Sequence, residues 1–297
     1  MKISSIVGKD KLTLSFEVFP PKTDSDFEKV KEAAFGVAAI KPAYISVTYG
    51  AGGSTSTNTL AIAKGIQEKY GVATIAHLTC VGASKDSIIK SLSDMRDAGI
   101  ENVLALRGDK PKWFDGEPFK EYKYASELVS TIKEFGGFSV GGACYPEVHP
   151  DSANRQEDII NLKKKVDAGC EFLTTQMFFD NSVYYDFVEN VRKAGIDVPV
   201  IPGIMPITRE SQIENVIKLS GCKMPQQFIK IVDRFKEDKA SMKQAGIIYA
   251  TQQILDLYAN GVKNVHVYSM NDSSVAGAIY NNCLLYTSPS PRDMRRS

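Results

Sequence analysis

Short apolar segments alternate with longer amphipathic segments along most of the chain. In residues 86–99, Ile88, Leu92 and Met95 recur at helical spacing, with charged side chains between them. The apolar segments have the length of strands, and eight strands are predicted, at residues 12–20, 44–49, 73–80, 102–109, 139–147, 172–179, 199–207 and 264–270. Regular alternation of strands and helices predicts an α/β protein with a parallel sheet.

Glycine follows several of the predicted helices and leads into the next strand. Gly99, Gly169 and Gly195 each follow an alanine, and Gly261 follows an asparagine before the last strand. Glycine suits the left-handed position just after a helix, so these residues indicate short, repeated helix-to-strand loops. Eight such units favour a closed (β/α)8 TIM barrel. The alternative, an open doubly wound sheet, more often has G-x-G-x-x-G after its first strand, and this chain does not.

One connection is much longer than the others. Residues 208–263 have room for about three helices, including 226–235 and 240–259, which predicts a helical insertion between strands seven and eight. We expect residues 1–283 to form a single barrel domain. Residues 284–297 have no periodicity, two prolines and three arginines, and they predict a disordered or non-native tail.

Charge and composition exclude several classes of protein. A net charge of +1, from 36 basic and 35 acidic side chains, gives no reason to expect nucleic acid or a membrane surface as a partner. Five cysteines without C-x-x-C spacing argue against a disulfide framework, and three widely spaced histidines give no metal signature. No signal peptide or apolar span is found, so a cytoplasmic location is expected.

Polar side chains recur late in the predicted strands, where barrel enzymes have their active sites. They are Ser15, Glu17, Ser46, Thr48, His77, Arg107, Asp109, Tyr145, Glu147, Thr174 and Gln176. Considered singly, each could be structural, for example a paired carboxylate or a buried core histidine. Inside a barrel, each of these side chains would need its own hydrogen-bond or charge partner to offset the cost of burial. Together they therefore predict one polar site at the rim of the barrel.

Two further segments have weaker signals. Residues 50–53 are rich in glycine and follow a strand, but they lack the lysine of a P-loop. Asn161, Lys164 and Lys165 lie on adjoining faces of a helix that begins near Gln156. These three side chains are either a solvated basic face or a clamp on a phosphate.

Eight short motifs follow one another between about Leu12 and about Asn282. They are SFEVFPPK (15–22), SVTYGAGGS (46–54), AHLTC (76–80), LALRGD (104–109), YPEVHP (145–150), NLKKKVDAG (161–169), TTQMFFD (174–180) and PGIMPI (202–207). The series resembles that of the methylenetetrahydrofolate reductases. The resemblance implies a barrel that binds FAD at the carboxyl ends of its strands. It also implies reduction of 5,10-methylenetetrahydrofolate to 5-methyltetrahydrofolate by ping-pong hydride transfer from NADH or NADPH.

The resemblance also implies roles for individual residues. Glu17 is similar to the family's general acid, and Asp109 to an aspartate beside the flavin and the pterin. Positions similar to those that bind substrate or nicotinamide are Thr48, Asp109, Gln176 and Gln212. Positions similar to flavin contacts are Tyr49, Ala51, His77, Arg107, Gly108, Asp109, Ala125, Tyr145, His149, Asp158, Asn161, Lys164 and Lys165.

The chemistry of this reaction suits two carboxyl groups. The substrate must open to an iminium ion before it accepts hydride, so Glu17 is expected to hold a proton for the departing nitrogen. Phe16 and Val18 flank Glu17, and an apolar site would favour the neutral acid. Asp109 is expected to stay ionised and to stabilise the cation.

One position departs from the family pattern. An arginine commonly follows the asparagine at the end of strand eight, but here Asp272 follows Asn271. Either another cation substitutes or folate binding is weaker. Asp272, together with the absence of a separate nicotinamide-binding domain, leaves open a second hypothesis, a flavoprotein subunit that is active only with a partner or ferredoxin. A third hypothesis is a barrel that binds folate without reducing it, and Glu17, Asp109 and Gln176 argue against it. The sequence does not decide between NADH and NADPH, and it is compatible with a homo-oligomer.

Overall fold

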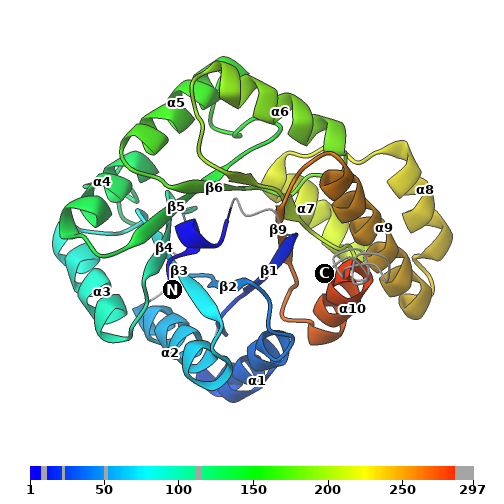
Figure 1. Cartoon of the computed structure of the whole chain (residues 1–297), viewed down its shortest axis with the longest axis horizontal. Coiled ribbons are helices and arrows are strands. Elements are labelled where there is room, and N and C mark those ends of the chain that lie inside the picture. Colours follow the sequence, from blue (N-terminus) through cyan, green and yellow to red (C-terminus); the bar gives the residue numbers. More distant parts are fainter. Residues whose placement is uncertain (8–11, 22–23, 50–52, 111–114, 285–297) are drawn as a thin grey trace, which may run out of the picture.

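The computed structural model describes residues 1–7, 12–21, 24–49, 53–110 and 115–284. Its strands are β1 (Thr13–Val18), β2 (Tyr44–Val47), β3 (Ala73–Thr79), β4 (Asn102–Leu106), β5 (Ser139–Cys144), β6 (Phe172–Thr175), β7 (Val200–Ile201), β8 (Gly203–Ile204) and β9 (Asn264–Tyr268). They form one parallel sheet in the order β7-β6-β5-β4-β3-β2-β1-β9-β8. The helices surround this ring (Figure 1). The predicted (β/α)8 barrel is confirmed.

The seventh predicted strand is in fact two short strands, which corrects the count from eight to nine. Pro202 separates β7 from β8, because proline has no N–H to give to a ladder. Its carbonyl still accepts a hydrogen bond of 2.9 Å from the backbone N–H of His266. Since β7 pairs with β6 and β8 pairs with β9, this interrupted segment closes the barrel.

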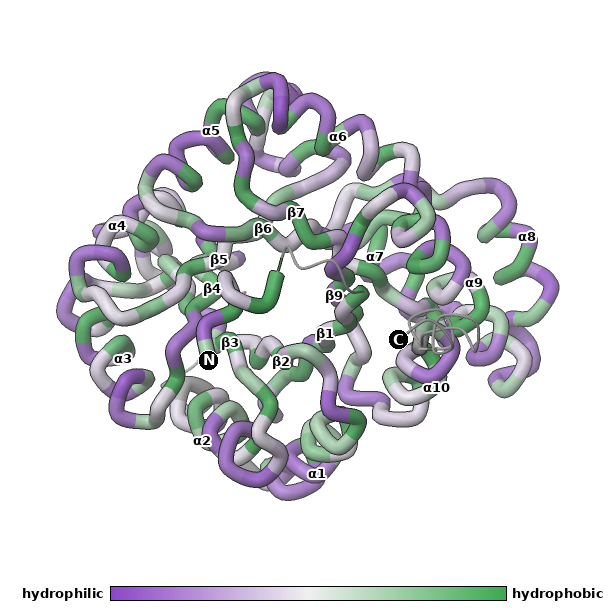
Figure 2. The backbone as a smooth tube through the Cα atoms, in the orientation of Figure 1, coloured by the Kyte–Doolittle hydropathy of each residue, from purple (hydrophilic) through white to green (hydrophobic). Residues whose placement is uncertain are grey.

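Except for β7, each strand is followed by a helix on the outside of the barrel. The helices are α1 (Phe27–Ala38), α2 (Gly53–Tyr70), α3 (Lys85–Asp97), α4 (Ala125–Phe135), α5 (Arg155–Asp167), α6 (Asn181–Lys193) and α10 (Ser273–Leu284), with short 3-10 turns η1 (Ile3–Ser5) and η2 (Asp24–Asp26). In α3 the buried side chains are Ile88, Leu92 and Met95, as the spacing predicts. Figure 2 shows hydrophilic residues most often on the surrounding helices.

The predicted insertion between the last two barrel strands is confirmed. It contains η3 (Glu210–Gln212), α7 (Ile213–Ser220), α8 (Gln226–Phe235) and α9 (Lys239–Ala259). A separate cluster of buried side chains lies under it, including Met205, Val216, Phe228 and Met242. The insertion therefore has an apolar interior of its own beside the barrel.

The predicted helix-ending glycines adopt left-handed backbone conformations. Gly99, Gly169, Gly195 and Gly261 have φ angles of 75°, 120°, 71° and 89°. L-residues with a side chain rarely adopt these angles, which explains why glycine recurs at the end of the helical segments. The strands, in contrast, end earlier than predicted, so that Arg107, Asp109 and Gln176 lie in the loops that follow β4 and β6.

The amino end of the barrel is closed by the start of the chain. Ile3 and Val7 are buried against Tyr44, Leu104 and other interior side chains. Asn102 fixes this segment: its side-chain oxygen accepts a 2.7 Å hydrogen bond from the Ile3 N–H, and its amide donates to the Met1 and Thr74 carbonyls. The opposite, carboxyl end of the strands is therefore the end at which a site can form.

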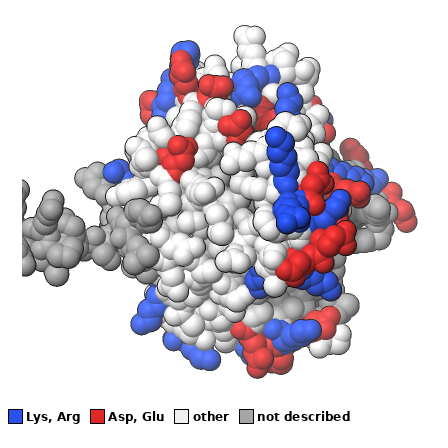
Figure 3. Space-filling model, turned by 90° about the vertical axis from the view of Figure 1, so that its right-hand side faces the viewer, with Lys and Arg blue, Asp and Glu red and all other residues white. Residues whose placement is uncertain are grey.

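None of the described helices combines the length and the apolar character that crossing a membrane needs. On the face in Figure 3, acidic and basic side chains lie close to one another, so neither sign covers a broad area. The predicted tail lies outside the described residues except for Leu284, which ends α10. The predicted domain boundary stays a prediction.

Candidate active site

Glu17 lies at the carboxyl end of β1 and faces the barrel interior. Its Oε2 is 3.3 Å from Ser46 Oγ, 3.5 Å from His77 Nε2 and 3.9 Å from His266 Nε2. The Glu17 side chain is 22% exposed, whereas the two imidazoles are almost completely buried. The carboxyl group is thus open on one side and surrounded by polar groups on the others.

These neighbours correct the expectation that an apolar site keeps Glu17 neutral. Burial raises the pKa of Glu17, but hydrogen bonding toward His266, the nearby His77 and His266 rings and the Ser46 hydroxyl together outweigh it, and the pKa is lowered from its ordinary value of 4.5. Phe16 and Val18 point away from the interior into the apolar layer under the helices, which is why they do not set its environment. Before substrate binds, Glu17 is a carboxylate.

His77 comes from β3 and is 6% exposed. Burial lowers its pKa, the Glu17 carboxylate raises it and His266 lowers it, and the net direction is down. Its Nε2 has no hydrogen-bond partner among the described residues. Because an unmatched buried polar atom is costly, this nitrogen is available to a bound group at the barrel mouth.

A second polar cluster lies at the ends of β4 and β5. Arg107 donates hydrogen bonds of 3.1 Å to the Lys123 carbonyl and 2.5 Å to Asp151, so its ion-pair partner is not Asp109. The Tyr145 and His149 rings meet edge to face at 4.6 Å. Asp158 on α5 accepts a 3.1 Å hydrogen bond from the His149 backbone N–H. The fold therefore brings together predicted flavin-contact residues from the loop after β4, the loop after β5 and helix α5.

The basic residues of α5 divide into two environments. Lys164 is exposed and lies 3.2 Å from the Asn161 side-chain oxygen, whereas Lys165 is half-buried and donates a 2.6 Å hydrogen bond to the Ala143 carbonyl. Ala125 is buried at the start of α4. Gly108 has a φ of 78°, and a Cβ there would approach Val81 to 2.9 Å, so the loop after β4 needs glycine.

Tyr145 connects two of the predicted folate-binding residues. Burial raises the pKa of Tyr145, a hydrogen bond with Gln176 lowers it, and the Asp109 charge raises it again. The Gln176 side-chain oxygen also accepts a 3.0 Å hydrogen bond from the Met177 N–H. Asp109 itself is exposed. Thr48 is fixed through its backbone N–H, which donates to the Val18 carbonyl at the end of β1.

Gln212 is 8% exposed in η3, at the start of the insertion. Its side-chain oxygen accepts hydrogen bonds from the backbone N–H groups of Thr208 and Arg209, at 2.9 and 3.0 Å. The amide nitrogen is buried and has no partner among the described residues. A buried donor of this kind fits the predicted contact with a folate.

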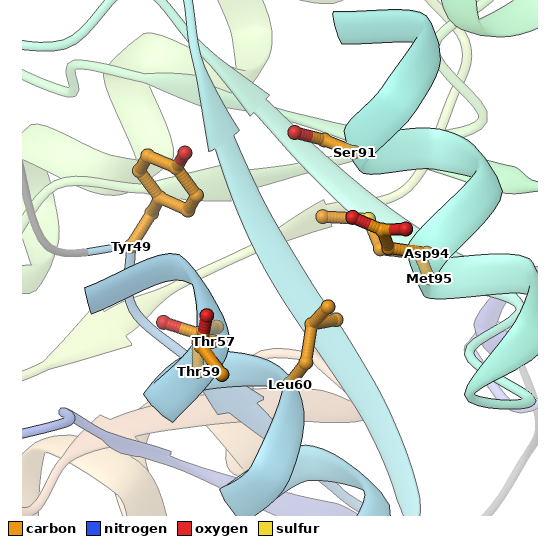
Figure 4. Close-up of a pocket in the computed structure, with 7 residues that line it drawn as sticks. All are labelled: Tyr49, Thr57, Thr59, Leu60, Ser91, Asp94 and Met95. Atoms are coloured by element: carbon orange, nitrogen blue, oxygen red, sulfur yellow. The ribbon is translucent and has the colours of Figure 1, made fainter. Parts of the chain in front are cut away.

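A pocket of about 230 Å³ lies between α2 and α3, and Glu17 is not among the described residues that line it. Tyr49 lines it together with Thr59, Leu60, Asp94 and Met95 (Figure 4). Tyr49, which follows β2, thus faces the outer side of β3. The predicted contact Ala51 and the glycine-rich segment before α2 lie outside the described residues.

Two interior residues of β9 were missed by the sequence analysis. His266 lies 2.8 Å from Ser15 Oγ and 3.1 Å from Ser46 Oγ, and the Tyr268 hydroxyl donates a 2.6 Å hydrogen bond to the Thr175 carbonyl. The signal was present, since Asn264, His266 and Tyr268 alternate with two valines as polar residues do in the other strands. His266 was considered only as a metal ligand. No metal-binding group of three or more acidic, histidine or cysteine side chains occurs within the described ranges.

The position that departs from the family pattern is paired with a lysine. Asp272 lies 2.8 Å from Lys243 Nζ on α9, and Lys243 also reaches Ser274 Oγ at 2.7 Å. The Asp272 side chain accepts hydrogen bonds from the Ser274 and Val275 N–H groups and so caps α10. The neighbouring Asn271 makes two 3.0 Å hydrogen bonds with the Phe19 backbone, which join the ends of β9 and β1.

We expect Asp272→Ala to lower the free energy of unfolding by about 1–2 kcal/mol through loss of the cap. Asp272→Asn is the matched control: it can still cap, and the exposed ion pair with Lys243 contributes about 1 kcal/mol or less. Burial raises the pKa of Asp272, but Lys243, Ser274 and Val275 outweigh it and lower the pKa from 3.8 to about 2.

A lowered folded-state pKa means that this stabilisation is present above pH 3.8 and is lost as the pH falls toward 2. Denaturant unfolding of both variants, from neutral to acidic pH, measures it. Equal losses in the two variants would show that the charge, and not the cap, is what matters.

The match to known proteins covers nearly all of the chain. The family described as Methylenetetrahydrofolate reductase matches residues 2–283. The chain belongs to the methylenetetrahydrofolate reductase family. It is 36% identical to a 5,10-methylenetetrahydrofolate reductase of Pectobacterium carotovorum over 91% of this chain and 89% of that protein. Identity is again 36%, over 90% of this chain and 89% of the relative, with the protein of that name from Escherichia coli.

Longer relatives share the same region. Methylenetetrahydrofolate reductase (NADH) 1 of Arabidopsis thaliana is 35% identical over 99% of this chain, which corresponds to 52% of the plant protein. A solved structure from Clostridium thermocellum, an uncharacterised protein that binds two copies of 5-methyl-5,6,7,8-tetrahydrofolic acid, matches 94% of this chain with a TM-score of 0.62. At 14% identity this last match supports the barrel fold alone.

The described residues fit a flavin dinucleotide. Arg107, Lys164 and Lys165 supply cations at the ends of β4 and on α5, as a pyrophosphate requires. His77 offers a buried ring nitrogen that has no hydrogen-bond partner among the described residues, and Gly108 keeps the loop after β4 free of a side chain. The donor set therefore agrees with the family's cofactor.

Proposed function

We propose that this chain reduces 5,10-methylenetetrahydrofolate to 5-methyltetrahydrofolate, with NADH or NADPH as the electron donor in a ping-pong reaction. The observation that carries the proposal is Glu17 at the mouth of the barrel, beside His77, in a chain that belongs to this oxidoreductase family. FAD, held by Arg107, Lys164, Lys165 and His77, would supply the hydride-carrying group.

Glu17 would be the proton donor to the folate nitrogen that departs when the ring opens. The pKa of Glu17 is lowered before substrate binds, so the carboxylate must take up a proton when substrate binds. Its 22% exposed side chain gives the physical reason: a ligand over the mouth removes the remaining water, and this burial raises the pKa of Glu17. Substrate binding thus prepares the acid.

The other side chains bind and orient the folate. The Gln212 amide nitrogen, buried without a partner among the described residues, would donate to it from the insertion side. Gln176, supported by Tyr145, would contact it from the end of β6, and Thr48 from the end of β2. Asp109 would stabilise the cationic iminium. Lys243, which is paired with Asp272, would supply a cation near the position after Asn271, where the family commonly has arginine.

An anaerobic flavin assay tests the proposal. The purified protein should be yellow, NADH or NADPH should bleach its flavin absorbance, and 5,10-methylenetetrahydrofolate should restore it. The faster of the two nicotinamides identifies the donor. Reduction only with a partner protein or ferredoxin would support the flavoprotein-subunit hypothesis. A colourless protein that still binds folate would rule out the reductase.

A further inference from the structure

His266 joins polar side chains of three neighbouring strands inside the barrel. Its Nδ1 is 2.8 Å from Ser15 Oγ on β1, and its Nε2 is 3.1 Å from Ser46 Oγ on β2. Ser46 Oγ is in turn 3.3 Å from Glu17 Oε2, and Ser15 Oγ is 3.2 Å from the Val265 carbonyl oxygen. These contacts form one hydrogen-bonded chain from the Val265 carbonyl to the Glu17 carboxyl group, named here the His266 chain.

The inner members of the His266 chain are shielded from water. Ser15, Ser46 and His266 are each 2% exposed. Each serine hydroxyl has one hydrogen to donate, and a neutral imidazole has one N–H and one bare nitrogen. An unmatched donor or acceptor in this interior would be costly, so the protonation of one member restricts all the others.

When Glu17 is ionised, every hydrogen bond of the His266 chain can form with the donors pointing toward the carboxylate. The carboxylate can only accept, so the Ser46 hydroxyl donates to it. Ser46 Oγ then accepts from a proton on His266 Nε2, and the bare Nδ1 accepts from the Ser15 hydroxyl. In this arrangement a singly protonated ring carries its proton on Nε2.

When Glu17 is protonated, the same hydrogen bonds can form with donor and acceptor exchanged at each contact. The acid donates to Ser46 Oγ, and the Ser46 hydroxyl donates to a bare His266 Nε2. The ring proton is now on Nδ1 and is donated to Ser15 Oγ, while the Ser15 hydroxyl turns to the Val265 carbonyl. The two states differ by one proton, which Glu17 carries; the ring holds one proton and each serine one hydroxyl hydrogen in both.

We propose that His266 is a positioning residue that lets Glu17 alternate between carboxylate and carboxylic acid by changing which ring nitrogen carries its proton. This inference rests on the proposed function of Glu17 as the acid. It explains why a buried imidazole lies between two serines, neither of which carries a charge. It also gives the neutral acid a matched partner, which an apolar pocket would lack.

The other titratable groups around the His266 chain do not replace this coupling. His77 of β3 lies 3.5 Å from Glu17 Oε2 on the open side. The Tyr44 ring of β2 stacks on His266 with ring centroids 5.9 Å apart. Tyr268 of β9 donates its proton to the Thr175 carbonyl. Within the described part of the chain, the histidine rings within 4 Å of Glu17 Oε2 are those of His77 and His266.

Nitrogen-15 NMR of the ring nitrogens tests the proposal on the purified full chain. The sequence has three histidines, so the resonances of His266 are assigned by comparison with His77→Gln and His149→Gln. At neutral pH, the wild type should show a neutral His266 ring protonated on Nε2. Glu17→Met removes the acceptor, so the Ser46 hydroxyl should turn to Nε2 and the ring proton should move to Nδ1.

Two comparisons separate this coupling from a general disturbance. Glu147→Met removes a carboxylate that instead binds the Lys223 N–H, and it should leave the His266 ring protonated on Nε2. In a Ser46→Ala background, Glu17→Met should no longer change which nitrogen of the His266 ring carries the proton. The same ring form in the wild type and Glu17→Met, or a doubly protonated His266 at neutral pH, overturns the proposal.

The folate half-reaction gives a second readout. Ser46→Ala should slow it by roughly tenfold to hundredfold, the typical effect of losing a hydrogen bond to a charged group. A change of ring form without any folate reduction counts against the proposed function and leaves this inference standing. Folate reduction with a fixed His266 ring form counts against this inference alone.

Discussion

Glu17→Gln should slow the folate half-reaction by roughly 10²- to 10⁴-fold while NADH or NADPH still reduces the bound flavin. Glutamine has nearly the same shape and keeps an acceptor for Ser46, but it cannot give a proton to the departing nitrogen. Anaerobic stopped-flow measurement of flavin absorbance follows the two half-reactions separately. Full folate reduction by Glu17→Gln would exclude the acid role.

The pH dependence of the same half-reaction provides a control. The pKa of Glu17 is lowered in the free protein, so near neutral pH the acid forms only when substrate binds. The wild-type rate should therefore fall as the pH rises through the pKa that Glu17 has in the complex. Glu17→Gln should show no such fall. A slope that persists in the variant would assign the titration to another group.

Gly246→Ala should lower the free energy of unfolding by about 1–3 kcal/mol or more, because it overfills a tight backbone contact. Gly246 lies in α9 against the segment that follows β8, and a Cβ there would stand 1.9 Å from the Ile207 carbonyl oxygen. Neither backbone can move without disturbing the insertion. Because Ile207 precedes Thr208, which Gln212 binds, the variant should also raise the KM for the folate.

Gly277→Ala in α10 is the matched control for this prediction. Among the described residues, a Cβ at Gly277 meets only Ile40 Cδ1, at 3.9 Å, so the variant should gain up to about 1 kcal/mol from better helix propensity. Denaturant unfolding compares the two proteins under the same conditions. If Gly246→Ala were as stable as Gly277→Ala, the close packing of α9 on Ile207 would be wrong.

Much of the fold could be predicted because its signals are local. Helical spacing in α3 and the glycines after four helices depend on neighbouring residues, and both predictions are confirmed. The polar positions near the strand ends could be found from their alternation, and the motif series named the family that the comparisons show. The roles of individual site residues stay predictions, since they concern bound ligands.

The errors arose where partners are distant in the sequence. The predicted strands extend too far toward their carboxyl ends, because a strand stops where its neighbour stops pairing. One continuous strand was predicted from the apolar residues 199–207, but Pro202 divides it into β7 and β8. Glu17 was expected in an apolar pocket because only its chain neighbours, Phe16 and Val18, were considered. In a strand these side chains point to the opposite face, so they say little about the surroundings of Glu17.

The sequence by itself determined the order of strands and helices, the insertion and the residue types available at the mouth of the barrel. Only the tertiary structure decided which of these residues act together. Ser15 and His266 are 251 positions apart, and Ser46 and His266 are 220 apart, yet barrel closure makes them neighbours. The physical reason is that charge and proton position depend on through-space contacts, which hydrophobic periodicity does not record.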